Sequence, residues 1–286
     1  MPPAPTLEGR LICACNCAYD IVAAGPLPTD PANVYYAGAG FTGTPAAFIN
    51  DTSIHACLVG TIPDGVVVAF RGTLTWNISD RNSLRDWLND FAANLVRPGW
   101  LPADSQARVH AGFLAALEYL VAQGALAEVN RQLQAAGAGT PLFITGHSKG
   151  GAVAALAAHR VWTTDATPSR IVTYAAPHVG DPAFADVYNL AHIQHTRYEF
   201  QNDIVPHAPP SIGGVLAQLQ RLPGVGSLLT GLKQYDYEPL GELRFIDWSN
   251  QVVADGRMLD FRRMAHIGCG KSFGSAYAER KVQLRS

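Results

Sequence analysis

Residues 142–150 read Leu-Phe-Ile-Thr-Gly-His-Ser-Lys-Gly and place Ser148 between two glycines, directly after a short apolar run. An alanine-rich helical segment, Ala152–His159, follows at once. A serine at a sharp strand-to-helix turn projects its hydroxyl beyond the end of a sheet, and flanking glycines let strand and helix approach closely. The segment therefore predicts a nucleophile elbow, the turn that carries the reactive serine of many hydrolases.

A second stretch, Gly270–Gly274, fits the same short pattern around Ser272. It follows residues 262–266, which do not form an apolar strand, and only the last few residues of the chain come after it. The overlapping stretch Ala265–Ser272 also resembles a relaxed phosphate-binding loop, which would imply nucleotide binding, but it lacks the preceding strand that such a loop requires. We therefore interpret Ser272 as a loop serine.

Apolar runs and helical segments alternate along the rest of the chain. The predicted strands are Val66–Phe70, Leu142–Thr145 and Ile171–Ala175, and the main predicted helical segments are Gly112–Ala136 and Gly151–Trp162. Short, partly β-branched runs are typical of buried parallel strands. The alternation predicts an α/β fold, with a mostly parallel central sheet flanked by helices, as a single domain over residues 1–286.

The charge balance and the hydropathy pattern argue against several classes of protein. Charged residues make up 15% of the chain and the net charge is -2, so no basic field attracts nucleic acid. The nearest candidate for a spanning helix, Ile212–Leu232, is interrupted by two glutamines, Arg221, a proline and several glycines, so we expect no transmembrane anchor. Residues 1–8 do not resemble a signal peptide, which leaves a cytoplasmic protein and a mature secreted form both open. We expect a monomer.

The cysteines do not suggest a disulfide framework or a metal site. Cys13, Cys15 and Cys17 alternate along the chain, so on a helix their side chains point in different directions. Buried apolar packing explains them better than metal binding. We predict no metal and no cofactor.

A serine nucleophile needs a base and an acid that orients the base. In elbow hydrolases the order along the chain is serine, acid, histidine. Asp203 follows the strand-like segment Thr196–Phe200 and is the predicted acid. Of the two histidines beyond it, His207 lies on the same short loop, so His266 is the predicted base.

The tetrahedral intermediate of acyl transfer needs two hydrogen-bond donors. The backbone amide that follows the nucleophile, here that of Lys149, supplies one of them. The other comes from a loop after an earlier strand. The run Val67–Phe70 is such a strand, and Arg71-Gly72-Thr73 is the loop that follows it.

The chain resembles the fungal-type, or class 3, lipase family of α/β-hydrolases. Six stretches match the family in order: Ala69–Thr73, Asp86–Asp90, Val109–Phe113, Gly146–Ala152, Thr173–Asp181 and Asn202–Pro206. The resemblance implies an α/β-hydrolase fold and a triad of Ser148, Asp203 and His266. It also implies that Thr73 donates its amide and hydroxyl to the oxyanion, together with Lys149. The chain departs from the family at His178, where an arginine is usual.

The resemblance also places a candidate lid at residues 74–85. Trp76, Ile78 and Leu84 in this segment could cover the site in water and turn outward on lipid, although an ordinary surface helix fits the segment equally well. A mobile apolar cover favours esters with medium to long acyl chains. The segment Ile212–Leu232 fits a pocket wall, a membrane-facing flap, packed core and a loop insertion equally well.

We therefore predict a serine-dependent carboxylic ester hydrolase, most consistent with a triacylglycerol lipase that works through an acyl-enzyme. Its partner would be a lipid or other ester substrate at an oil–water interface. A short-chain or feruloyl-type esterase and a phospholipase are the alternatives within this class. A non-catalytic binding protein on the same fold is the alternative from a different class, because fold alone does not fix function.

Overall fold

The computed structural model describes residues 6–21, 34–50, 54–73, 94–163, 167–201, 203–209, 211–212, 214–221 and 236–254. The chain divides into two compact units. The first consists of Met1–Leu74, Gly112–Tyr174 and Ala191–Thr196, and the second of Thr75–Ala111, Ala175–Leu190 and Arg197–Ser286. The candidate lid at 74–85, Ser272 and His266 lie outside the described residues. The prediction of a single domain over residues 1–286 stays a prediction.

Five strands form the sheet of the first unit, in the order β1-β2-β3-β6-β7. They are β1 (Ala46–Ile49), β2 (Ala56–Ile62), β3 (Gly65–Phe70), β6 (Leu142–His147) and β7 (Arg170–Tyr174). The pairs β1–β2 and β2–β3 are antiparallel, whereas β3–β6 and β6–β7 are parallel. The ends of β3, β6 and β7 therefore come together at one edge of the sheet, where Phe70 pairs with Gly146 and His147 pairs with Tyr174.

The predicted strands 66–70, 142–145 and 171–175 are confirmed as β3, β6 and β7, with ends shifted by one or two residues. Every residue of β3 is buried, and so are the first five residues of β6. Parallel strands covered on both faces bury continuous apolar runs rather than alternating ones. That is why these three strands could be recognised from the sequence.

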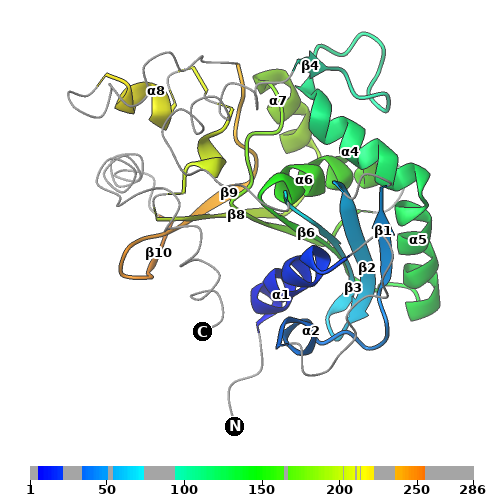
Figure 1. Ribbon diagram of the computed structural model, residues 1–286. Helices are drawn as coiled ribbons and strands as arrows, with labels where there is room; N and C mark the ends of the chain where they lie inside the picture. Colours follow the sequence, from blue (N-terminus) through cyan, green and yellow to red (C-terminus); the bar gives the residue numbers. More distant parts are fainter. Residues whose placement is uncertain are drawn as a thin grey trace. The chain divides into compact units, whose positions relative to one another are not determined.

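Helices cover both sides of these strands (Figure 1). The helices are α1 (Leu7–Tyr19), α2 (Val34–Ala39), α4 (Ala111–Ala122), α5 (Ala125–Ala136) and α6 (Lys149–Trp162). Contacts join α1 to β3 and β6, α6 to β3, β6 and β7, and α5 to β2 and β3. Figure 1 shows α1 and α5 on opposite sides of the strands. The predicted helical segment 151–162 is confirmed as part of α6.

The predicted segment 112–136 consists of two helices rather than one. Gly124 separates α4 from α5, with φ 97°, a left-handed conformation that glycine adopts without strain. The two helices are bent by 56°. Within the described residues, no single helix is long and apolar enough to span a membrane, and α4 and α5 meet the length and composition test only as this bent pair.

The cysteines of α1 pack in the interior as predicted. Cys15 and Cys17 are buried and Cys13 is half-buried. A side-chain carbon at Gly38 would lie 2.6 Å from the Cys13 sulfur, so the missing side chain lets α2 pack against α1. Burial raises the pKa of Cys15 and of Cys17 to about 12, which keeps these thiols protonated and unreactive at neutral pH.

The strand β8 (His195–Phe200) begins in the first unit and continues into the second. In the second unit it is followed in the sheet by β9 (Glu242–Ile246) and β10 (Val252–Val253), and a separate pair is formed by β4 (Leu95–Val96) and β5 (Val109–His110). The described residues of this unit also form three helices, α7 (Pro182–Leu190), the 3-10 helix Val205–His207 and α8 (Val215–Leu219). In α8 four of the five side chains are buried. The described part of the segment 212–232 therefore includes packed core.

Candidate active site

Ser148 occupies the sharp turn between β6 and α6, as the sequence predicts. Its backbone has φ 57° and ψ -132°, a strained conformation for a residue with a side chain. The turn is fixed on both sides, because the Ser148 amide donates to the Tyr174 carbonyl at 2.9 Å and the Gly151 amide donates to the Ser148 carbonyl at 2.8 Å. Ser148 is half-buried. A strained residue held by its surroundings at a strand end is a feature of catalytic sites.

The glycines on each side of Ser148 are required by close backbone approaches. A side-chain carbon at Gly146 would collide with the Gly150 carbonyl and would lie 2.7 Å from the Gly151 nitrogen. One at Gly150 would collide with the Phe70 carbonyl oxygen. Any larger residue would therefore push α6 away from β6 or from the end of β3, and the serine would move with it.

The loop after β3 lies directly against Ser148, the predicted nucleophile. A side-chain carbon at Gly72 would lie 3.1 Å from the Ser148 β-carbon and 2.7 Å from the His147 carbonyl oxygen. Thr73, the next residue, is half-buried and belongs to the same unit as Ser148 and Lys149. The structure thus brings Gly72 and the start of α6 together at Ser148, an arrangement that the predicted two-donor oxyanion hole requires.

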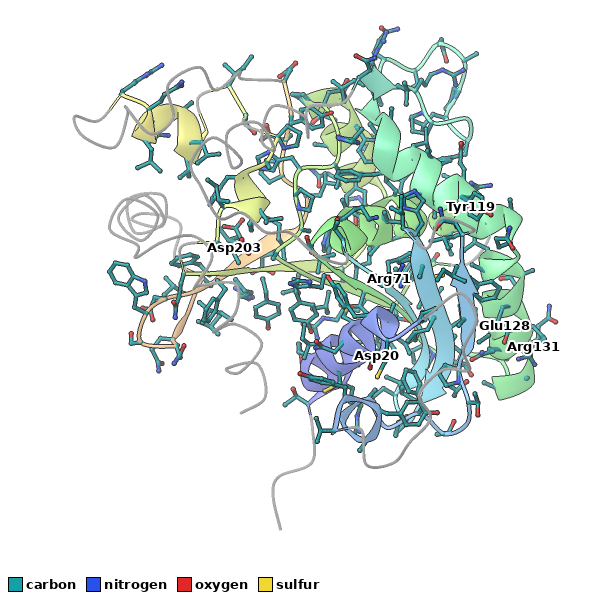
Figure 2. All side chains as sticks on the ribbon, viewed as in Figure 1. Asp20, Arg71, Tyr119, Glu128, Arg131 and Asp203 are labelled. Atoms are coloured by element: carbon teal, nitrogen blue, oxygen red, sulfur yellow. The ribbon has the colours of Figure 1, made fainter. Side chains whose placement is uncertain are left out.

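Arg71 anchors this loop from the inside of the protein. Its side chain is 1% exposed, and its guanidinium donates to the Ile21 carbonyl, just beyond α1, at 2.7 Å. Its backbone amide donates to the Ala56 carbonyl of β2 at 2.9 Å. Arg71 belongs to the first unit and is labelled in Figure 2. Burial lowers the pKa of Arg71, but a guanidinium keeps its charge at neutral pH, so a fixed positive charge lies behind the loop.

The Lys149 side chain holds the start of α6 to the connection between β1 and β2. Its ammonium donates to the Ile54 carbonyl at 3.0 Å and lies 3.2 Å from the His55 Nδ1. Burial, and then the charge of Arg71, lower the pKa of Lys149 from 10.5 to about 8. Burial, then Lys149 and Arg71, lower the pKa of His55 to about 4. A neutral His55 can accept a hydrogen bond from the ammonium, so the Lys149 side chain is held at the β1–β2 connection.

We expect replacement of Lys149 by methionine, which keeps the aliphatic length, to change how stability depends on pH. The native pKa of about 8 lies below the unfolded value of 10.5, so burying the ammonium costs stability below about pH 8. That cost disappears as the pH rises to the unfolded value, because the unfolded chain then binds more protons than the native one. Relative to the variant, the wild-type free energy of unfolding should rise by roughly 2–3 kcal/mol across this window.

Urea unfolding of both proteins at neutral pH and above about pH 10 measures this difference. A second readout is the titration of His55 by NMR, because removal of the Lys149 charge should raise the pKa of His55 from its value of about 4. A difference in stability that is the same at both pH values would contradict a buried, ionised Lys149.

Sequence reasoning did not identify Tyr19 as part of the site. The Tyr19 hydroxyl lies 2.7 Å from the Nδ1 of His147, the residue before Ser148. The two rings are tilted by 60° with centroids 5.8 Å apart. The same hydroxyl would be struck by any side chain at Gly72. Tyr19 therefore supports both the elbow and the loop that faces it.

Asp203 is described within the second unit, on the turn after β8 (Figure 2). Its amide donates to the Phe200 carbonyl at 3.0 Å, and its Oδ1 accepts from the Val205 amide at 3.0 Å. This second bond holds the carboxylate at the start of the 3-10 helix Val205–His207. His207 is 5% exposed within that helix. Asp203 thus lies just after the end of a strand, as the sequence predicts.

His178 has a structural environment in the second unit. Its Nδ1 lies 2.8 Å from the Pro209 carbonyl oxygen and 3.0 Å from the Ser211 hydroxyl, and its amide donates to the Ala208 carbonyl at 2.7 Å. These contacts tie the loop after the 3-10 helix to the segment that follows β7. Among the described residues, no group of three or more His, Cys, Asp or Glu side chains could hold a metal ion.

Comparison with known proteins agrees with this geometry. The family described as "Lipase (class 3)" matches residues 67–213. The chain is 32% identical over 199 residues to a lipase of Rhizopus niveus, covering 68% of this chain and 46% of the relative. It is 29% identical over 207 residues to the secreted mono- and diacylglycerol lipase 1 of Fusarium solani, covering 71% and 55%. The chain therefore spans about half the length of these curated relatives.

A solved structure, lipase II from Rhizopus niveus, is similar in fold, with a TM-score of 0.63 at 23% identity over 90% of each chain. The strand–turn–helix arrangement around Ser148 is the α/β-hydrolase arrangement that the sequence predicts. The expected fold class is thereby confirmed.

Proposed function

The chain belongs to the class 3 lipase family, and from this premise we propose that it is a serine-dependent carboxylic ester hydrolase that acts as a triacylglycerol lipase on medium to long acyl chains. The observation that carries the proposal is the strained turn of Ser148, with φ 57°, held against the Gly72 loop. The names of the relatives from Rhizopus niveus and Fusarium solani, a lipase and a mono- and diacylglycerol lipase, support glycerol esters as the substrate class.

In the proposed mechanism His266 takes the proton of the Ser148 hydroxyl as Ser148 attacks the ester carbonyl. The backbone amides of Thr73 and Lys149, with the Thr73 hydroxyl, stabilise the negative oxygen of the tetrahedral intermediate. Asp203 orients His266 and stabilises its charged form. His266 then protonates the departing alcohol, and a water activated by the same histidine releases the acid from Ser148.

Chain-length preference tests the substrate class. Nitrophenyl esters with acyl chains of about two to sixteen carbons are hydrolysed below and above their micellar limits, with emulsified triacylglycerol and phosphatidylcholine as natural substrates. A lipase is expected to favour long chains and to gain activity at the interface, because an opened apolar site is favoured on lipid. Activity confined to short, soluble esters would instead identify an esterase, and preference for phosphatidylcholine a phospholipase.

A further inference from the structure

The strands β9 and β10 of the second unit form a hairpin (Figure 1). Two of its side chains are apolar and exposed. Trp248, in the connecting turn, is 52% exposed, and Val252, the first residue of β10, is 55% exposed. Single exposed apolar side chains are ordinary on protein surfaces. Here, however, a tryptophan and a valine that are both more than half exposed lie four positions apart on one short hairpin.

The turn that presents Trp248 is held rigidly by its own polar groups. The Oδ1 of Asp247 accepts hydrogen bonds from the Ser249 amide at 2.9 Å, the Ser249 hydroxyl at 2.8 Å and the Gln251 amide at 3.1 Å. Asn250 adopts φ 57°, a left-handed conformation that asparagine tolerates. A fixed turn loses little conformational entropy when its tip binds a surface, so its apolar side chains are already arranged for contact.

The tip of the hairpin, residues 247–251 together with the adjoining strand ends, carries little charge. Between Phe245 and Ala254 the only charged residue is Asp247, and its Oδ1 is occupied by the turn itself. Moving a charged or unsatisfied polar group toward hydrocarbon is costly. The tip carries a single carboxylate, and hydrogen bonds from its neighbours satisfy one oxygen of that group, so fewer polar groups oppose contact with an apolar surface.

The tip lies at the same end of the strands as the predicted catalytic acid. The Gln201 amide donates to the Ile246 carbonyl at 2.8 Å, and the Arg197 side chain donates to the Leu240 carbonyl at 3.1 Å. The earlier residue of the first segment contacts the earlier residue of the second, and the later contacts the later. The strands β8 and β9 therefore run in the same direction. Asp203 follows the end of β8 and Trp248 follows the end of β9. Ligands of α/β sheets bind beyond these carboxyl ends.

We propose that Trp248 and Val252 form a docking point for a lipid–water surface, which holds the catalytic edge of the second unit against aggregated substrate. Indole rings favour the boundary between water and hydrocarbon because they have a large apolar face and a polar N–H. This inference rests on the proposed function, in which the ester substrate is presented as a lipid aggregate.

Partition onto phosphatidylcholine vesicles tests the docking point directly. The full chain with Ser148→Ala, which prevents hydrolysis of the vesicles, is compared with the same chain carrying Trp248→Ser in a flotation assay. We expect the partition coefficient to fall about tenfold, and Trp248→Phe to recover most of the loss. The matched control is Leu190→Ser, at the end of α7 in the same unit, where the side chain is 71% exposed; it should leave partition unchanged.

Kinetics with Ser148 intact separate this proposal from the proposed function. Trp248→Ser should keep kcat/KM on a short soluble ester and lose activity on emulsified triacylglycerol. If no ester is hydrolysed but Trp248→Ser still weakens vesicle binding, the proposed function fails and the docking point stands. Equal partition of Trp248→Ser and its parent would overturn the docking point. So would a shift from dimer to monomer in sedimentation with partition unchanged, because the partner would then be a second copy of the chain.

Discussion

Replacement of Ser148 by alanine is expected to lower kcat for ester hydrolysis on the order of 10⁶-fold, which is the size of effect that loss of a triad serine produces. The predicted reaction requires a covalent bond from the Ser148 oxygen to the acyl carbon, and alanine has no atom that can form it. The fold should be retained, because alanine fits the space of serine and both backbone hydrogen bonds of the turn come from main-chain groups. Hydrolysis of a nitrophenyl ester, with circular dichroism to check folding, gives the measurement.

The chain supplies its own matched control, because Ser272 lies in a second Gly-x-Ser-x-Gly match. Ser272→Ala should leave kcat within about twofold of the wild type, as expected for the loop serine that the sequence predicts there. If Ser272→Ala abolished activity and Ser148→Ala did not, the nucleophile would have been assigned to the wrong match.

Replacement of His266 by alanine is the second change with a large expected effect. Without its base, the Ser148 hydroxyl keeps its proton and becomes a poor nucleophile. We expect kcat to fall by about 10⁴- to 10⁶-fold while KM changes little, because the histidine acts in the transition state rather than in substrate binding. The residual activity should no longer follow the titration of a group with a pKa near that of histidine.

His207 provides the control for this prediction, since it is the other histidine beyond Asp203 in the sequence. It is 5% exposed in the 3-10 helix after Asp203. His207→Ala should therefore reduce stability more than catalysis, by about 1–3 kcal/mol in the free energy of unfolding. If His207→Ala folded normally and lost activity as completely as His266→Ala, His207 would be identified as the base instead.

The elements around Ser148 were predictable because their signals are local. The Val66–Val68 run marks a buried strand by composition alone, and nine residues suffice to identify the strand–serine–helix turn. Asp203 was predictable for a related reason, since the family order places an acid after a later strand. The structure describes Ser148, Asp203, Thr73 and Lys149 at the strand ends where these signals placed them. The triad itself stays a prediction.

The supports of the site could not be predicted because they join distant parts of the chain. Tyr19 meets His147 across 128 positions, and Lys149 meets His55 across 94. No local pattern distinguishes these side chains from any other tyrosine or histidine. Their roles follow from how α1 and the β1–β2 connection pack against β6 and α6.

The break at Gly124 shows a different limit. A single glycine in an apolar helical pattern lowers helix stability but does not by itself end a helix. Here the backbone adopts φ 97° and the chain turns by 56°. The helix α5 packs on β2 and β3 after the bend, and the sequence pattern of 112–136 does not predict this tertiary contact.

Covalent labelling tests the central claim most directly, namely that Ser148 is the nucleophile of an ester hydrolase. The full chain is treated with a long-chain alkyl phosphonate ester, which reacts with activated serines, and the labelled position is found by peptide mass spectrometry. We predict one label per chain, on Ser148, with activity lost in proportion to labelling and with no label in the Ser148→Ala variant. A label on Ser272, or full loss of activity without a label on Ser148, would contradict it.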